Sequence, residues 1–263
     1  MLKIGVFDSG LGGLTVVKAL RQVIKNAHIF YVADTKNAPY GEKTPEQILQ
    51  YSLNITQYLI DTYKIDALVL ACNTATSFAI KQLRMLYPEL IIVGTEPGVK
   101  PAIEQTQTGK IGILATPATL KGEKYQELVN LCTTQKDVEV FEQACPGLVE
   151  QIEKGAHLSP ETKTLLEKWV LPMKAKNVDT IVLGCTHYPL VGDTITEIMV
   201  CDVILVDTGL AIANRLLDLA LAEGHDNNGL LEIDILSTGS IQTHLVEQIL
   251  QLPIAVKNIT ITN

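Results

Sequence analysis

The sequence of 263 residues lacks the features of several protein classes, and each absence excludes one of them. No run of Lys or Arg exceeds two residues and the formal net charge is −8, so a basic surface for nucleic acid or anionic lipid is not expected. No apolar run approaches the roughly 18 residues of a membrane-spanning helix. The N-terminus enters strand-like residues 2–7 without the charged segment and cleavage site of a signal peptide. We therefore expect a cytoplasmic protein that binds neither nucleic acid nor membrane.

The number and spacing of the cysteines also argue against a disulfide framework and a zinc cluster. The five cysteines are odd in number, widely spaced and without a C-x-x-C pair: Cys72, Cys132, Cys145, Cys185 and Cys201. A thiol redox protein needs two cysteines close enough for disulfide exchange, so this class is disfavoured for the same reason. Cys132 and Cys201 are expected to be small buried hydrophobic residues.

A repeated motif organises what is present. Residues 67–76 (ALVLACNTAT) and 180–189 (TIVLGCTHYP) each form a short apolar run that stops at a cysteine, Cys72 or Cys185. Such a run predicts a buried parallel strand that enters a tight turn and then a helix N-terminus. Both thiols would then lie at the carboxyl edge of a sheet, where α/β proteins bind ligands. Two such edges facing each other would hold a small molecule between two sulfurs, as a two-base reaction requires.

A glycine-rich turn, residues 8–13 (DSGLGG), follows the first strand-like segment. Glycines permit a tight turn and a close approach of the backbone to a ligand. A phosphate loop fits poorly, because the third glycine of a dinucleotide fingerprint is replaced by Thr15 and Asp8 would repel a phosphate. Asp8 could cap the following helix or hold an ammonium group, and both interpretations stay open.

Strand-like and helix-like segments alternate along the chain, which predicts an α/β protein. Strands are expected at 3–7, 28–33, 66–71, 91–94, 110–115, 138–141, 180–184, 203–206 and 231–236. Helices are expected from about 14, over 44–64, 75–86 and 120–131, after 144–150, and over 160–176, 208–222 and 241–250. Residues 116–119 are expected to form a turn. The polar loop 34–42 presents Tyr40 and Gly41, and by itself this loop is typical of a surface turn.

The domain organisation follows from length and from the absence of a linker. A chain of this size exceeds one average domain, with 47% hydrophobic and 19% charged residues typical of ordered globular proteins. No Pro-, Gly- or Ser-rich tether separates the halves, so the chain is expected to cross a compact boundary twice. The predicted domains are 1–97 with 207–263, and 98–206.

Several motifs together resemble the glutamate racemases of the aspartate/glutamate racemase superfamily, in order along the whole chain. They are Asp8 and Ser9 with the glycine turn, residues 38–41 (APYG), 71–74 (ACNT), 148–150 (LVE) and 184–187 (GCTH). The paired cysteine motifs are the most specific of these. The resemblance implies two pseudo-symmetric α/β/α (flavodoxin-like) domains with the active site in the cleft between them.

The resemblance also implies roles for individual residues. Cys72 and Cys185 would be the acid/base thiols, with Asp8 near the first and His187 near the second. Glu150 would be a further catalytic residue, the acidic residue of the LVE segment, although many members carry a longer stretch before it than residues 145–148 (CPGL) here. The substrate-contacting positions would be Asp8, Ser9, Pro39, Tyr40, Gly41, Asn73, Thr74, Thr116, Thr119, Thr186 and His187.

The activity implied by the resemblance is the interconversion of L- and D-glutamate, which supplies D-glutamate for peptidoglycan. Members work without pyridoxal phosphate or metal and are often homodimers, so no cofactor and a homodimer are expected here. A racemase of a related acidic amino acid such as aspartate is the nearest alternative. A binding protein for an acidic amino acid would explain two α/β lobes but not a cysteine at both edges.

Overall fold

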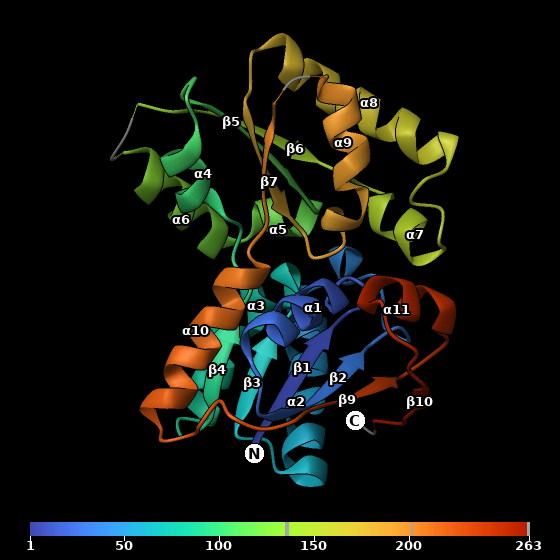
Figure 1. Cartoon of the computed structure of the whole chain (residues 1–263). Helices are drawn as coiled ribbons and strands as arrows, with labels where there is room; N and C mark the ends of the chain where they lie inside the picture. The colour runs from blue at the N-terminus through green and yellow to red at the C-terminus, as the bar shows by residue number, and fades with distance from the viewer. Residues whose placement is uncertain (135–136, 201, 262–263) are drawn as a thin grey trace. The chain divides into compact units, whose positions relative to one another are not determined.

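The computed structural model describes residues 1–134, 137–200 and 202–261 of the chain. The chain folds into two compact units, Met1–Thr95 with Thr208–Asn263, and Glu96–Asp207. Each unit contains one sheet, and every strand pairing described in the two sheets is parallel. Helices alternate with strands along the chain (Figure 1), which confirms the predicted α/β class with two mainly parallel sheets.

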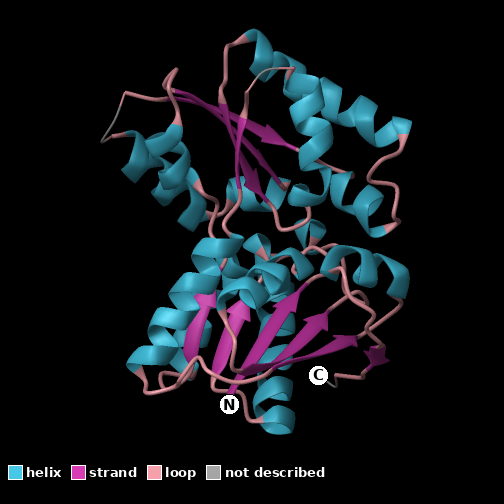
Figure 2. Cartoon of the chain, viewed as in Figure 1, coloured by secondary structure: helices cyan, strands magenta, loops and turns pink. Residues whose placement is uncertain are grey.

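The sheet of the first unit has the strand order β10-β9-β2-β1-β3-β4. Its strands are β1 (Leu2–Asp8), β2 (Ala27–Ala33), β3 (Ala67–Leu70), β4 (Ile91–Gly94), β9 (Leu231–Ser237) and β10 (Val256–Asn258). Its helices are α1 (Leu14–Val23), the 3₁₀-helix η1 (Tyr40–Glu42), α2 (Pro45–Tyr63), α3 (Asn73–Leu86), α10 (Gly209–Ala222) and α11 (Thr243–Leu250). Figure 2 shows the arrowheads of the long strands pointing to one edge, as in any parallel sheet.

Two hydrophobic cores cover the two faces of this sheet. Ile4 and Val6 of β1 pack with α1, α10 and α11 on one face, whereas Phe7 packs with α2 and α3 on the other. Side chains alternate between the faces of a strand, so a strand covered on both faces must be apolar at nearly every position. This explains why the strands appear in the sequence as continuous apolar runs.

The register of this sheet aligns the ends of its central strands. Asp8 is level with Ala33 of β2, and Leu70 of β3 is level with the residue before Asp8. Cys72 comes two residues after Leu70. Asp8 and Cys72 therefore lie at the same carboxyl edge of one sheet.

The sheet of the second unit has the strand order β6-β5-β7-β8. Its strands are β5 (Lys110–Ala115), β6 (Glu139–Ala144), β7 (Thr180–Gly184) and β8 (Ile204–Val206). Its helices are α4 (Val99–Gln105), α5 (Pro117–Lys121), α6 (Glu123–Thr133), α7 (Leu148–Glu153), α8 (Pro160–Ala175), the 3₁₀-helix η2 (Tyr188–Val191) and α9 (Gly192–Met199). Two further cores, one on each face, bury this sheet.

The strand ends of the second sheet are also level with one another. Ala115 of β5 pairs with both Ala144 of β6 and Gly184 of β7. Each of these residues is the last of its strand, so the three segments that follow begin at one edge. The first residues of those segments are Thr116, Cys145 and Cys185.

Some predicted boundaries are wrong. The turn expected over 116–119 is the start of helix α5, because Thr116 caps it and Pro117 occupies its first position. A helix expected directly after Thr186 is also wrong, since the 3₁₀-helix η2 intervenes and α9 begins only at Gly192. Helix α4 and the short strand β10 had no prediction at all.

Two predictions concern cysteines whose side chains are outside what the structure describes. Cys201 lies outside the described residues, and the side chain of Cys132 is not described either. Within the described ranges, no helix is both long enough and apolar enough to cross a membrane.

The capping box of α2 gives a stability prediction. The Gln47 backbone N–H donates to Thr44 Oγ1 at 3.3 Å, and the Thr44 N–H donates to Gln47 Oε1 at 3.1 Å. Thr44→Ala removes the first of these bonds and should lower the free energy of unfolding by about 1 kcal/mol in urea titrations followed by circular dichroism. Thr62→Ala makes the same change at an exposed position of the same helix and should change it by less than about 0.5 kcal/mol. Equal losses in the two variants would contradict the capping role.

Candidate active site

Cys72 lies between the end of β3 and the first residue of α3. It is the N-cap residue of that helix, and its Sγ accepts a hydrogen bond from the Ala75 backbone N–H at 3.4 Å. The thiol is 6% exposed, and Sγ is 4.0 Å from Ser9 Oγ. The unpaired N–H groups and the dipole at a helix N-terminus stabilise negative charge, so this position favours a thiolate.

The glycine turn after β1 encloses the carboxylate of Asp8. This side chain is fully buried and accepts hydrogen bonds from the backbone N–H groups of Ser9, at 2.7 Å, and Gly13. A Cβ at Gly13 would lie 2.6 Å from Asp8 Cβ and 2.9 Å from the Tyr31 ring, so only glycine fits there. The turn therefore holds an internal carboxylate where a phosphate loop would hold a ligand's phosphate.

Tyr40 is buried, which makes the interpretation of loop 34–42 as a simple surface turn wrong. The residue opens η1 after the cis bond between Ala38 and Pro39, and η1 packs against α3. Burial raises the pKa of the Tyr40 phenol well above its usual value, and the negative charges of Asp34, Cys72 and Asp8 add to the effect. The phenol therefore stays protonated and donates to Asp34 Oδ2 at 2.6 Å. Pro39 and Gly41, on either side, are half-buried.

Asn73 and Thr74 form the first turn of α3, directly after Cys72. Both side chains are buried. The Asn73 carbonyl accepts a hydrogen bond from Ser77 Oγ at 3.0 Å within the helix. The predicted residues Asp8, Ser9, Tyr40, Cys72, Asn73 and Thr74 thus all lie at or next to the carboxyl edge of the first sheet.

Cys185, in the second unit, belongs to a chain of three polar side chains. Its Sγ is 3.7 Å from His187 Nδ1, and His187 Nε2 is 2.5 Å from Glu153 Oε1. Burial by itself would lower the pKa of His187, but the hydrogen bonds and charges of Cys185 and Glu153 outweigh it and raise that pKa well above its usual value. The imidazole therefore carries a proton on both nitrogens, between a sulfur and a carboxylate.

The carboxylate bonded to His187 is that of Glu153, which was not among the predicted site residues. Glu153 ends helix α7, and Glu150 lies one turn earlier and is half-buried. Burial is the main cause that raises the pKa of the Tyr188 phenol, and the charge of Glu150 adds a smaller effect. Residues three apart on a helix lie on neighbouring turns of one face. The segment 148–153 (LVEQIE) therefore offered two carboxylates at helical spacing, and only the first was considered.

The remaining predicted residues of the second unit are also buried. Thr116 caps α5, and its hydroxyl donates to Thr119 Oγ1 at 2.9 Å while accepting the Thr119 N–H. Thr186 lies between Cys185 and His187 and is 6% exposed.

Cys145 is a second thiol at the edge that carries Cys185, but its environment is unlike that of a base. Burial, followed by the charge of Cys185, raises the pKa of Cys145 to about 12. Its Sγ lies 3.5 Å from the Gln143 carbonyl oxygen, to which it donates. Cys145 therefore stays a neutral thiol at physiological pH.

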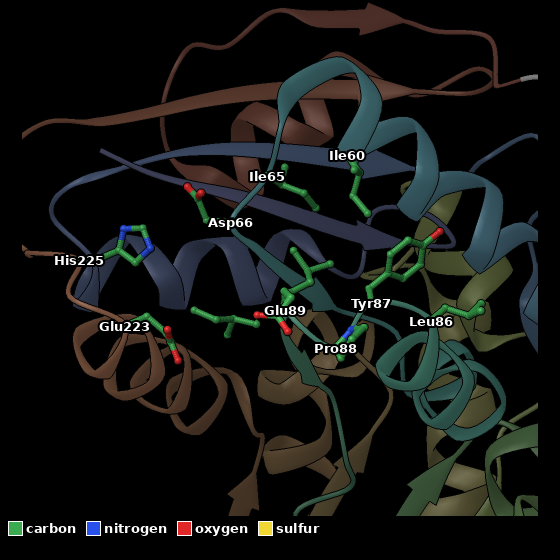
Figure 3. Close-up of a pocket in the computed structure, with 11 residues that line it drawn as sticks. Ile60, Ile65, Asp66, Leu86, Tyr87, Pro88, Glu89, Glu223 and His225 are labelled. Carbon is green, nitrogen blue, oxygen red and sulfur yellow. The ribbon is translucent and has the colours of Figure 1, made fainter.

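A surface cavity of about 530 Å³ in the first unit is a separate feature (Figure 3). It includes Asp66 and Ile91, at the amino ends of β3 and β4, and so lies at the edge opposite to Cys72. Its lining carries the carboxylates of Asp66, Glu89 and Glu223 and no Lys or Arg. This cavity would repel an anionic substrate and is not the candidate active site. Across the described ranges, no group of three His, Cys, Asp or Glu side chains is placed to hold a metal ion.

Comparisons with known proteins identify the family of the chain. The family model described as Asp/Glu/Hydantoin racemase matches residues 4–216. The chain is 63% identical to the glutamate racemase of Sulfurovum sp. (strain NBC37-1) over 249 residues, which cover 95% of this chain and 94% of that protein.

Two crystal structures of glutamate racemases are similar along the whole chain. The Escherichia coli enzyme, in complex with L-glutamate and the activator UDP-MurNAc-ala, has a TM-score of 0.87 at 28% identity, covering 100% of this chain and 99% of that one. The Francisella tularensis enzyme, in complex with D-glutamate, has a TM-score of 0.84 at 26% identity, with 99% and 97% covered. Because the family model spans most of its length and a 63% identical relative is matched almost end to end, the chain belongs to the Asp/Glu/Hydantoin racemase family of isomerases.

Proposed function

We propose that this racemase interconverts L- and D-glutamate by proton transfer at Cα between the thiols of Cys72 and Cys185, without pyridoxal phosphate or a metal. The observation that carries the proposal is that each sheet presents, at its carboxyl edge, a buried cysteine with polar partners of its own. The substrate follows from the relatives, whose names and complexes specify glutamate. D-Glutamate supply for peptidoglycan, a cytoplasmic location and a homodimer belong to the same proposal.

Inversion of an amino-acid Cα needs two groups because the proton leaves from one face and arrives on the other. One fixed base can only return the proton to the face from which it came. A thiol with an ordinary pKa of ~8.5 can act as an acid or a base near neutral pH when its surroundings stabilise the thiolate. The proposed reaction therefore requires Cys72 and Cys185 to approach the same Cα from opposite faces, with one thiol supplied by each predicted domain (1–97 with 207–263, and 98–206).

In the first unit, the dipoles at the start of α3 stabilise the thiolate form of Cys72. Its Sγ accepts the Ala75 N–H at the start of α3, and Ser9 Oγ lies nearby. Asp8 is ionised in a cradle of backbone N–H groups. We assign to Asp8 the orientation of the substrate ammonium group, whose positive charge it complements.

In the second unit, Cys185 has a cationic partner. The His187 imidazolium stabilises the Cys185 thiolate and can return a proton to it. Glu153 keeps His187 protonated and fixes its ring through the bond at Nε2. We therefore assign to Glu153, rather than to the predicted catalytic residue Glu150, the carboxylate that acts together with His187.

Binding of the substrate's two carboxylates cannot depend on long-range attraction, because the protein has a net charge of −8. Backbone N–H groups at the start of α3 and the surrounding hydroxyl and amide groups supply local donors instead. The substrate-contacting residues in this proposal are Ser9, Pro39, Tyr40, Gly41, Asn73, Thr74, Thr116, Thr119 and Thr186. The carbanion at Cα also needs preorganised donors in a site that excludes water.

Replacement of either thiol tests the two-base assignment. Cys72→Ala and Cys185→Ala should each abolish racemisation, measured by circular dichroism of L- or D-glutamate in buffer that contains a chelator and no added pyridoxal phosphate. Cys145→Ala is the matched control, because this thiol stays neutral, and it should keep activity within about threefold of the wild type. Near-normal activity in either of the first two variants would refute the assignment.

The pH dependence tests the pair of Glu153 and His187. Glu153→Gln removes a charge and a hydrogen bond that raise the pKa of His187, so the imidazolium loses its proton at lower pH. The alkaline limb of the kcat/KM profile should move to lower pH by about one unit, with a loss of about tenfold near pH 8. Glu150→Gln makes the same change one turn away and should leave this limb in place. A shift in the second variant alone would restore the assignment based on sequence.

Isotope transfer distinguishes two bases from one. In D₂O, L-glutamate should give D-glutamate deuterated at Cα from the first turnovers, because the delivering thiol has exchanged with solvent. The remaining L-glutamate should stay largely protiated at low conversion, because return from the same face gives back the original proton. Proton NMR of both enantiomers measures this, and early product that keeps its Cα hydrogen would show that a single base carries the proton across.

A further inference from the structure

Asp34 is a buried carboxylate that the reaction proposed above does not use. It follows β2 at the same edge as Asp8, and its backbone N–H donates to the Asp8 carbonyl oxygen at 2.9 Å. The side chain is 1% exposed. A buried charge is costly unless hydrogen-bond donors surround it, so the groups around Asp34 indicate what it holds in place.

Three side chains donate to this carboxylate. Tyr40 Oη lies at 2.6 Å and Asn37 Nδ2 at 3.0 Å from Oδ2, and Thr238 Oγ1 lies at 2.7 Å from Oδ1. Asn37 and Tyr40 belong to the loop after β2, whereas Thr238 follows β9, which is some 200 residues away along the chain. Asp34 thus ties the loop that carries Tyr40 to the segment that returns to this sheet from the second unit.

The bond from Tyr40 to Asp34 matters for the candidate site because it fixes the position of Tyr40. Its ring packs in the same core as Cys72 and Phe7, and its centroid is 5.8 Å from that of Tyr51. Hydrophobic contacts are non-directional, whereas the short hydrogen bond from Tyr40 Oη to Asp34 fixes the position of the phenol group. Backbone and side chain of Pro39, Tyr40 and Gly41 are then held beside Cys72.

We infer that Asp34 is a positioning residue: it anchors Tyr40, and with it the substrate-contacting segment 39–41, beside Cys72, and Thr238 completes the anchor. This inference rests on the proposed racemisation of glutamate. Segment 39–41 would contact the substrate and the transition state alike, so loosening it removes binding that is uniform along the reaction. Asp34 should therefore affect KM more than kcat.

Kinetics of Asp34→Asn and Thr238→Val test the inference. Asp34→Asn removes the charge and replaces one acceptor oxygen by an NH₂ group, which cannot accept a hydrogen bond from the donors around it. Thr238→Val removes one of those donors. KM for both enantiomers should rise by about tenfold in the first, as expected for one hydrogen bond to a charged group, and by less in the second, with kcat within about threefold. Thr35→Val is the matched control, because its hydroxyl bonds Ser237 Oγ at 2.9 Å in the same region without touching Asp34, and KM should stay within about twofold.

A double substitution shows whether Asp34 acts through Tyr40. When Tyr40→Phe has already removed the phenol, Asp34→Asn should raise KM by less than about twofold further. Fully additive effects, or an unchanged KM in Asp34→Asn, would overturn the inference. Should Asp34→Asn not fold, Thr238→Val decides: an unchanged KM there refutes the anchor.

Tryptic cleavage after Lys36, measured without substrate, separates this inference from the proposed function. Lys36 is exposed in the anchored loop, and its cleavage should be faster in Asp34→Asn than in the wild type. Faster cleavage supports the anchor even if the wild type were inactive on glutamate, and an unchanged rate counts against it. The wild-type rate of racemisation tests the proposed function by itself.

Discussion

The parallel register of the two sheets is the constraint on which the candidate site depends. Parallel strands begin at one edge and end at the other, so whatever follows them gathers at the carboxyl edge. In the first sheet this brings the ends of β1, β2 and β3 level, and with them Asp8, Asp34 and Cys72. In the second sheet it does the same for Thr116, Cys145 and Cys185. The register of the strands is therefore enough to bring residues that are far apart in the sequence to the same edge of a sheet.

The strands and the thiols were predictable because they depend on local patterns. A strand buried on both faces must be apolar throughout, and its end is marked by the first small or polar residues, as at Cys72 and Cys185. The glycine turn was also visible, since Gly13 has no room for a Cβ beside Asp8.

What the sequence did not reveal depends on contacts between distant segments. Glu150 and Glu153 have the same local signal, and only the position of α7 relative to His187 separates them. Tyr40 lies in a polar loop typical of a surface turn, yet a carboxylate at the end of β2 and a hydroxyl after β9 draw this loop into the core. Helix α4 was missed because Pro97, Gly98 and Pro101 are typical of loops, although a proline is tolerated in a first helical turn.

The two thiols occupy equivalent positions in their sheets, but in the proposed reaction their thiolate forms are stabilised in different ways. Cys72 begins a long helix and relies on backbone dipoles, whereas Cys185 precedes a 3₁₀-helix and relies on an imidazolium. A dipole is fixed, but an imidazolium can lose its proton, so the electrostatic environment of Cys185 changes with the protonation of His187. Glu153 opposes that change by raising the pKa of His187. Glu153, the carboxylate on the Cys185 side, thus favours the protonated form of His187. Asp8, the carboxylate on the Cys72 side, instead accepts hydrogen bonds from backbone N–H groups. In the proposed reaction, one strand-end position therefore supports a thiolate in two physically different ways, because an α-helix follows Cys72 whereas an imidazole and a 3₁₀-helix follow Cys185.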